Sequence, residues 1–89
     1  MNVYTLELTE TELACGVTLD AVADELPRGG FFGALGEQLF MVSDNVWPAL
    51  AGAVARCAFA GPVEYVGMTN GYPCYQRSVI QKISCCTLN

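Results

Sequence analysis

Hydrophobic and polar residues follow two different periods in the first third of the chain. Over residues 3–8, large apolar side chains occupy the even positions, which is the pattern of a half-buried β-strand. Thr9 and Glu12 then form the sequence pattern of a capping box, which predicts that a helix begins at Thr9. Pro27 and the glycines that follow it end this helix.

The predicted first helix has two different faces. Its core-facing stripe repeats at helical spacing and consists of Cys15, Leu19, Val22 and Leu26. The opposite face gathers Glu10, Asp20, Asp24 and Glu25, with Leu13 and Val17 among them. Two interpretations stay open. Either Gly16 breaks the helix and turns both apolar residues inward, or the acids and apolar residues together form a docking surface.

A glycine-rich β-hairpin follows the first helix. Its strands are predicted at residues 31–35 and 38–42, joined by a two-residue turn, and this pairing places Gly33 opposite Phe40. No Lys-Ser or Lys-Thr pair follows the glycines and no helix opens behind them. A phosphate-binding loop is therefore not the interpretation that this stretch favours.

A second helix is predicted after this hairpin. Ser43 and Asp44 are N-cap candidates, Pro48 suits the first helical turn, and Gly61 ends the element. The apolar stripe of this helix consists of Leu50, Val54 and Cys57. The many alanines around that stripe favour close packing against a neighbouring element.

The Asn-Gly pair at positions 70–71 is the strongest turn signal in the chain. Both residues accept the positive φ angles of a type I′ hairpin turn. Pairing outward from this turn predicts Val66 opposite Tyr75. It also predicts Glu64 opposite Arg77, which would form an ion pair between the two strands.

The predicted elements occur in the order strand, helix, hairpin, helix, hairpin. Residues 78–86 alternate poorly and are predicted as a further strand, with a short helix as the alternative. The β-α-β-β-α-β-β order is that of a ferredoxin-like fold in the α+β class. We expect one domain, residues 1–89, forming a small two-layer sandwich with two helices packed on an antiparallel sheet of four to five strands.

Composition and charge add an expectation about partners. Hydrophobic residues make up 53% of the chain, more than so small a domain is able to bury, so we expect a protein partner or a second copy to cover part of them. The net charge is −5, and residues 1–27 hold six Asp and Glu but no Lys or Arg. This balance argues against direct binding of nucleic acid, which relies on clustered Lys and Arg.

The same residues suggest where the protein works. The N-terminus lacks a basic segment followed by an apolar one, so we expect no secretory signal. The most apolar run, residues 46–60, contains Pro48 and Arg56 and is too short to span a membrane. We expect a cytoplasmic protein without membrane contact, whose five cysteines stay reduced.

No catalytic or metal-binding pattern stands out. Histidine, the commonest general base and zinc ligand, is absent. No C-x-x-C pair occurs, and the adjacent Cys85 and Cys86 cannot both bind one ion in good geometry. Cys74, with Arg77 three residues later, is the best candidate nucleophile, although a structural role explains it better. We expect no enzyme activity, metal or cofactor.

Residues 12–26 are similar in rhythm to a helix-turn-helix motif, with small residues, a Gly-Val pair and then an apolar repeat. A helix that reads DNA needs basic or amide side chains near the phosphates and base edges. The second half of this stretch offers only Asp20, Asp24 and Glu25. Charge repulsion therefore excludes DNA reading as its function.

The leading hypothesis is a non-enzymatic module that binds a protein partner with a basic surface. The docking surface would consist of Glu10, Leu13, Val17, Asp20, Asp24 and Glu25. Basic protein surfaces commonly hold nucleic acid, so covering one with carboxylates would block it. Small phage-encoded inhibitors, such as anti-CRISPR proteins and DNA mimics, use this strategy. This chain is similar to them in size, acidity and lack of catalytic motifs.

The alternative is a homodimeric ferredoxin-like domain that regulates or binds a small molecule. In that case the apolar excess would be buried between two copies. The aromatic residues expected on the dimer face are Phe31, Phe32, Phe40, Tyr65 and Tyr72. Charge reversal in the first helix would abolish partner binding under the leading hypothesis but leave a dimer intact under this one.

Overall fold

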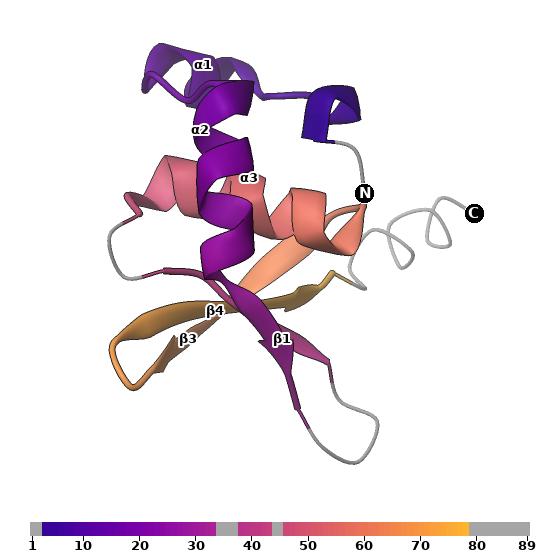
Figure 1. The fold of residues 1–89 in the computed structure, drawn as a ribbon, viewed down its shortest axis with the longest axis vertical. Helices are drawn as coiled ribbons and strands as arrows, with labels where there is room; N and C mark the ends of the chain where they lie inside the picture. Colours follow the sequence, from indigo (N-terminus) through magenta and orange to yellow (C-terminus); the bar gives the residue numbers. More distant parts are fainter. Residues whose placement is uncertain (1–2, 34–37, 44–45, 79–89) are drawn as a thin grey trace, which may run out of the picture.

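The computed structural model describes residues 3–33, 38–43 and 46–78. Along the chain the elements are η1 (Val3–Thr5), α1 (Glu10–Ala14), α2 (Leu19–Glu25), η2 (Leu26–Arg28), β1 (Gly30–Phe32), β2 (Leu39–Met41), α3 (Pro48–Phe59), β3 (Val63–Thr69) and β4 (Tyr72–Arg77). The four strands form an antiparallel sheet in the order β1-β2-β4-β3 (Figure 1). The predicted α+β class is confirmed, and so is an antiparallel sheet of four strands with helical packing on one face.

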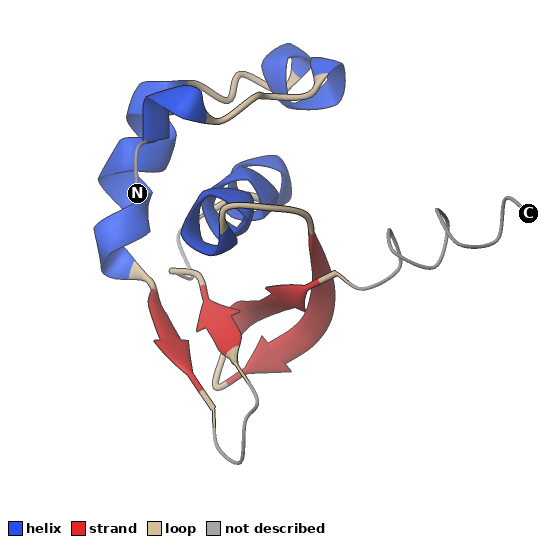
Figure 2. Ribbon diagram, turned by 90° about the vertical axis from the view of Figure 1, so that its right-hand side faces the viewer, coloured by secondary structure: helices blue, strands red, loops and turns tan. Residues whose placement is uncertain are grey.

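Helix α3 is the centre of the fold. The sheet covers one side of it, and α1 and α2 cover the other, so that the helix is enclosed (Figure 2). Its buried residues are Leu50, Ala51, Ala53, Val54, Ala55, Cys57, Ala58 and Phe59. The predicted stripe of Leu50, Val54 and Cys57 is confirmed, and the buried alanines let neighbouring elements approach α3 from more than one side. Pro48 occupies the first helical turn as predicted, while the N-cap is Trp47.

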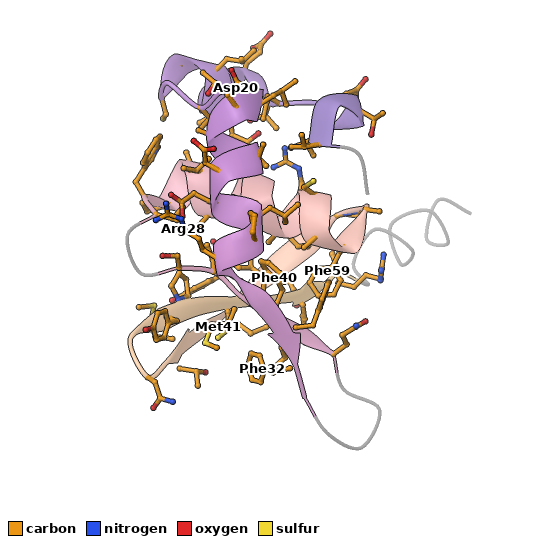
Figure 3. The ribbon with its side chains drawn as sticks, viewed as in Figure 1. Asp20, Arg28, Phe32, Phe40, Met41 and Phe59 are labelled. Carbon is orange, nitrogen blue, oxygen red and sulfur yellow. The ribbon has the colours of Figure 1, made fainter. Side chains whose placement is uncertain are left out.

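A row of aromatic residues joins the sheet to α3. Phe31 pairs with Phe40, Phe40 with Tyr75, and Tyr75 with Tyr65 across the four strands. Because paired residues share a face of the sheet, all four side chains lie on one side. The ring centroids of Phe31 and Phe59 are 5.2 Å apart, which identifies this side as the one that packs on α3. Figure 3 shows Phe40 and Phe59 on this side of the sheet, with Phe32 and Met41 on the other.

Residues 3–8 do not form the predicted strand. They form the single turn η1 followed by an extended segment. The Leu6 N–H donates to the carbonyl oxygen of Val3 at 3.1 Å, which closes this turn. Val3 is buried, and Leu6 and Leu8 pack against the core. Apolar residues in this short stretch recur both two and three positions apart. The contacts with the core favour the turn over the predicted strand.

The predicted first helix is two helices. It begins at Thr9 as expected, but α1 ends before Gly16, whose φ of +88° is incompatible with a helix. The Thr18 hydroxyl then accepts the Ala21 N–H at 3.1 Å and caps α2. The stripe predicted for one continuous helix is therefore only partly right, since Val22 is fully buried while Cys15 is exposed. Both helices chiefly contact α3 rather than the sheet.

The first hairpin is confirmed, but its register differs from the prediction. Phe31, rather than Gly33, lies opposite Phe40, which is a shift of two positions. A shift of two keeps each side chain on its predicted face of the sheet. The turn itself, residues 34–37, lies outside the described residues, as do Asp44 and positions 79–86 of the predicted last strand.

The type I′ turn at 70–71 is confirmed, since Asn70 and Gly71 have φ of 54° and 86°. Next to this turn the register is as predicted, but a bulge between Tyr65 and Gly67 shifts the rest of β3 by one residue. The predicted pairs of Val66 with Tyr75 and of Glu64 with Arg77 are consequently wrong. The observed pairs beyond the bulge are Tyr65 with Tyr75, Glu64 with Gln76 and Val63 with Arg77. The Arg77 guanidinium instead lies 5.3 Å from the Phe59 ring centroid.

The sheet also departs from the predicted ferredoxin-like order. Its first strand is missing because residues 3–8 are not a strand, and the described strands come from two hairpins placed side by side. The junction is β2 against β4, where Phe40 lies opposite Tyr75. A ferredoxin-like sheet needs the N-terminal strand between these hairpins or beside them, and in this protein that part of the chain covers α3 instead.

Candidate functional site

The N-terminal layer is held to α3 through one carboxylate. The Thr9 hydroxyl accepts the Glu12 N–H at 3.1 Å, and the Thr9 N–H donates to Glu12 Oε1 at 2.9 Å, which completes the predicted capping box. Arg56 of α3 then donates from Nη2 to the same oxygen at 2.8 Å and from Nη1 to Oε2. Arg56 Nη2 also donates to the carbonyl oxygen of Glu7 at 3.0 Å. Three oxygen atoms of the N-terminal segment therefore accept hydrogen bonds from one guanidinium.

This network fixes the charge of Glu12. Burial by itself raises the pKa of the Glu12 carboxyl, but the hydrogen bonds from Arg56 and Thr9 outweigh it and hold the pKa below its usual value. The hydrogen bond to Glu12 likewise raises the pKa of Arg56. Both groups are charged at neutral pH. Glu12 thus has a structural role, because its carboxylate is paired with Arg56 inside the protein.

Four of the six predicted docking residues are exposed, and we call them the acidic surface: Glu10, Leu13, Asp20 and Asp24. Leu13 is 58% exposed, and Glu10 lies one turn before it on the same face of α1. Asp20 and Asp24 are one turn apart on α2. Asp20 lies at the end of α2 that is nearest to α1 (Figure 3).

The other two predicted docking residues do not belong to this surface. Val17 is only 2% exposed and packs in the core, because the break at Gly16 turns it inward. Glu25 is half-buried, and its Oε1 is buried without a hydrogen-bond partner among the described residues. The predicted break at Gly16 is confirmed, and it turns Val17 inward but leaves Leu13 exposed, while the docking surface stays a prediction.

The five aromatic residues predicted for a dimer face are divided between the two sides of the sheet. The pairing places Phe31, Phe40 and Tyr65 on the side that packs on α3, whereas Phe32 and Tyr72 lie on the other side. Phe40 is 3% exposed and belongs to the core. Phe31, Tyr65 and Tyr72 are exposed, but they do not form one continuous face.

Sequence reasoning missed an apolar pocket of about 490 Å³ between α3 and the second hairpin. Its walls include Pro48 and Ala51 from α3, Tyr65 and Met68 from β3, and Pro73 and Tyr75 from β4. No local signal predicts such a pocket, because its walls come from three elements. The available hint was the run of large apolar residues in β3, of which Tyr65, Val66 and Met68 are exposed.

The cysteines of the described residues show no sign of a reactive centre. Cys74 is buried, and its Sγ lies 3.5 Å from the carbonyl oxygen of Tyr72. Cys57 is also buried, and burial raises the pKa of its thiol. Only Cys15 of these three is exposed. No three Cys, Asp or Glu side chains gather into a metal-binding group within residues 3–33, 38–43 and 46–78.

Two further findings bear on function. In the part of the chain that the structure describes, no helix is both long enough and apolar enough to cross a membrane. No protein-family model matches the chain, and comparisons with curated proteins and with solved structures found no significant match. The features of this protein that bear on function are therefore the acidic surface and the pocket.

Proposed function

We propose that this protein is a non-enzymatic binding module whose acidic surface docks on a basic surface of a protein partner. The observation that carries the proposal is Leu13, a large apolar side chain that is 58% exposed, next to Glu10 on α1. Leucine favours helix formation at an exposed position, but its apolar side chain gains from burial only at an interface. An interface gains from an exposed leucine, because interface centres are apolar and their rims are polar.

The partner is a nucleic-acid-binding protein, and its nucleic-acid site is the surface that becomes covered. Residues 1–27 hold six acids and no base, so the acidic surface attracts clustered Lys and Arg. Clusters of that kind bind phosphates. The protein therefore acts as an inhibitor that excludes nucleic acid, as small phage-encoded inhibitors of the anti-CRISPR kind do, and it has no direct affinity for nucleic acid.

The way α1 is held supports this role. A helix of five residues is not stable alone in water. The capping box and the Arg56 clamp fix α1 to α3, so little conformational freedom remains to be lost when Leu13 and Glu10 meet a partner. The clamp also keeps Arg56 away from the acidic surface, whose charge it would otherwise reduce.

The test begins with capture of partners by the tagged protein from its native host at two salt concentrations. A captured nucleic-acid-binding protein is then purified, and its affinity for this protein is measured. Asp24→Lys should weaken binding at least about tenfold, because it places like charges opposite each other, and Leu13→Ala should weaken it by a similar factor. Added nucleic acid should compete with this protein for the partner.

Glu7→Lys is the matched control, because it changes the net charge by the same amount at an exposed acid outside the acidic surface. It should weaken binding less than about threefold. Equal losses from Asp24→Lys and Glu7→Lys would contradict a defined docking surface. Simultaneous binding of nucleic acid and this protein to the partner would contradict the inhibitor role.

A homodimer is the second candidate, favoured by the exposed Phe31 and Tyr65, which lie on the same side of the sheet. Light scattering on the free protein distinguishes the two candidates. A tight dimer that persists in Asp24→Lys, together with no captured nucleic-acid-binding protein, would replace the docking proposal with this alternative. A monomer that captures such a protein in a salt-sensitive way would exclude it.

A further inference from the structure

We propose that the pocket between α3 and the β3–β4 hairpin is a binding site for a small, neutral and mainly apolar molecule. The site is separate from the acidic surface: α1 and α2 contribute no residue to the described walls of the pocket. The proposal is therefore independent of the protein-docking function. A volume of about 490 Å³ lies within the range of roughly 300 to 1,000 Å³ that is typical of small-molecule sites.

The β-bulge in β3 creates one wall of this pocket. Without it, regular pairing from the turn would place Val66 opposite Tyr75. The extra residue brings Tyr65 opposite Tyr75 instead, and the two rings meet edge to face with centroids 5.5 Å apart. Gly67, with φ of +120°, provides the backbone geometry that few other residues adopt. Bulges commonly redirect a side chain next to a binding site, and this one directs an aromatic ring.

Small residues on α3 keep the opposite wall open. Ala51 is almost fully buried and leaves the space that a larger side chain would fill. Pro48 stands at the start of the helix, and Met68 of β3 is 58% exposed at the pocket. Methionine is flexible and polarizable, and it adapts to ligands of different shapes.

The charge and polarity of the walls define the chemical class of the ligand. None of the described residues that line the pocket is charged, and the only polar side-chain groups among them are the hydroxyls of Tyr65 and Tyr75. An anion would meet no cation there and would be repelled by a net charge of −5. A cation would meet no carboxylate. A neutral molecule with a large apolar part and one hydrogen-bonding group fits these walls.

The size of the pocket favours a small molecule over a second copy of the chain. A stable dimer interface needs about 800 Å² on each partner. The pocket offers one concave site beside the second hairpin, lined by residues of α3, β3 and β4 and the segments next to them. A second copy that inserts a side chain into the pocket is therefore treated as an outcome of the test.

The experiment uses the full chain and N-phenyl-1-naphthylamine, a neutral apolar probe whose fluorescence rises when it leaves water. We expect saturable binding at one site on a monomeric protein. Met68→Ala and Tyr65→Ala remove walls from exposed positions, so they should weaken probe binding at least about fivefold without unfolding the protein. Circular dichroism checks that each variant is folded.

Two variants serve as matched controls. Val66→Ala removes an exposed apolar residue from the same strand, and Leu13→Ala removes one from the acidic surface. Both should leave the affinity for the probe within about twofold. Loss of binding in either control equal to that in Met68→Ala, or fluorescence that does not saturate, would overturn the proposal.

Amide chemical shifts provide a reading that does not depend on variants. On addition of the probe, the amides of Ala51 and Gly71 should shift, while that of Cys15 on the opposite layer should not. Shifts confined to the acidic surface would overturn the assignment. Light scattering that shows a dimer, with these amides shifting on dilution in the absence of probe, would identify a second copy as the occupant.

Discussion

The two layers that cover α3 are attached to it in different ways. The N-terminal layer is attached through charge, with Arg56 bound to Glu12 and to the carbonyl oxygen of Glu7. The sheet is attached through aromatic rings, with Phe31 in edge contact with both Phe40 and Phe59. One helix therefore presents a polar anchor to one neighbour and an apolar surface to the other.

Two glutamates show what this difference means. The Glu12 carboxylate accepts hydrogen bonds from both terminal nitrogens of the Arg56 guanidinium and from the Thr9 N–H, and the Glu12 N–H donates to the Thr9 hydroxyl. The bonds to the carboxylate offset the free-energy cost of burying its charge. Glu64, in the sheet, accepts one hydrogen bond from Gln76 Nε2 at 3.1 Å, while its Oε1 is buried without a partner among the described residues. A buried carboxylate therefore stabilises this small fold where a cation is brought to it.

The same difference separates the two candidate functional sites. Arg56 forms an ion pair with the inward-facing Glu12 of the N-terminal layer. Glu10 and Asp24 are exposed on the surface proposed for docking. On the sheet side, Tyr65, Tyr75 and Met68 line a pocket without a charged group among its described residues. A protein partner with basic residues and a neutral ligand would thus meet opposite layers of one molecule.

The largest expected effect comes from breaking the joint between the two layers at Gly29. This residue connects η2 to β1, and an added Cβ would lie 2.6 Å from the Met41 carbonyl oxygen and 2.7 Å from Cζ of Phe40. Because the carbonyl belongs to the backbone, the strands must move to make room. Gly29→Ala should lower the free energy of unfolding by about 3 kcal/mol, measured by urea denaturation.

The neighbouring glycine provides the control for this prediction. A Cβ at Gly30 would meet no atom within 4 Å, and Gly30 has no positive φ angle. Gly30→Ala should therefore change the free energy of unfolding by less than about 0.5 kcal/mol. Equal losses in the two variants would show that the close approach at Gly29 is not what matters at this joint.

The next effect tests the polar anchor. Glu12→Gln keeps an acceptor for the Thr9 N–H but removes the charge that Arg56 faces, so it should lower the free energy of unfolding by about 2 kcal/mol. Glu10→Gln, on the exposed side of the same helix turn, should lower it by only a few tenths of a kcal/mol through the helix dipole. A Glu12→Gln variant as stable as Glu10→Gln would show that the anchor contributes nothing.

The anchor should also depend on pH. The pKa of Glu12 in the folded protein lies below the ordinary value of 4.5. A depressed carboxyl pKa adds stability that is complete above the unfolded value and is lost as the pH falls through the folded value. The stability difference between the wild type and Glu12→Gln should therefore be constant above pH 5 or so and shrink on further acidification. A difference that grows on acidification would contradict this sign.

Local chemistry explains which helical features were predictable from the sequence. The capping box at Thr9, the Asn-Gly turn and Pro48 at the start of α3 each depend on residues within a few positions of one another. The Arg56 anchor was not predictable, because it joins residues 44 positions apart. The break at Gly16 was recognised as one option, but its consequence for Leu13 depends on how α1 is then held on α3.

The sheet shows a similar limit. The alternation of β3 predicts a strand and its turn, but one additional residue at the bulge changes each pair beyond it. Nothing in the local sequence identifies Val66 as the extra residue, because valine suits a regular strand equally well. The pocket walls depend on this bulge, so the pocket could not be predicted either. Four of the six residues proposed for docking are exposed, because residues three or four positions apart still share one face within each short helix.

The smallest expected effect concerns the second glutamate and sharpens the contrast with the first. Glu64→Gln keeps an oxygen that accepts the Gln76 amide and removes a half-buried charge that faces no described cation. The lost interaction and the relieved desolvation should nearly cancel, so the free energy of unfolding should change by less than about 0.5 kcal/mol in urea denaturation. A loss as large as that of Glu12→Gln would mean that a charge also matters within the sheet. Because Glu64 and Gln76 lie on the face of the sheet away from α3, that loss would come from inside the sheet and not from its contact with α3.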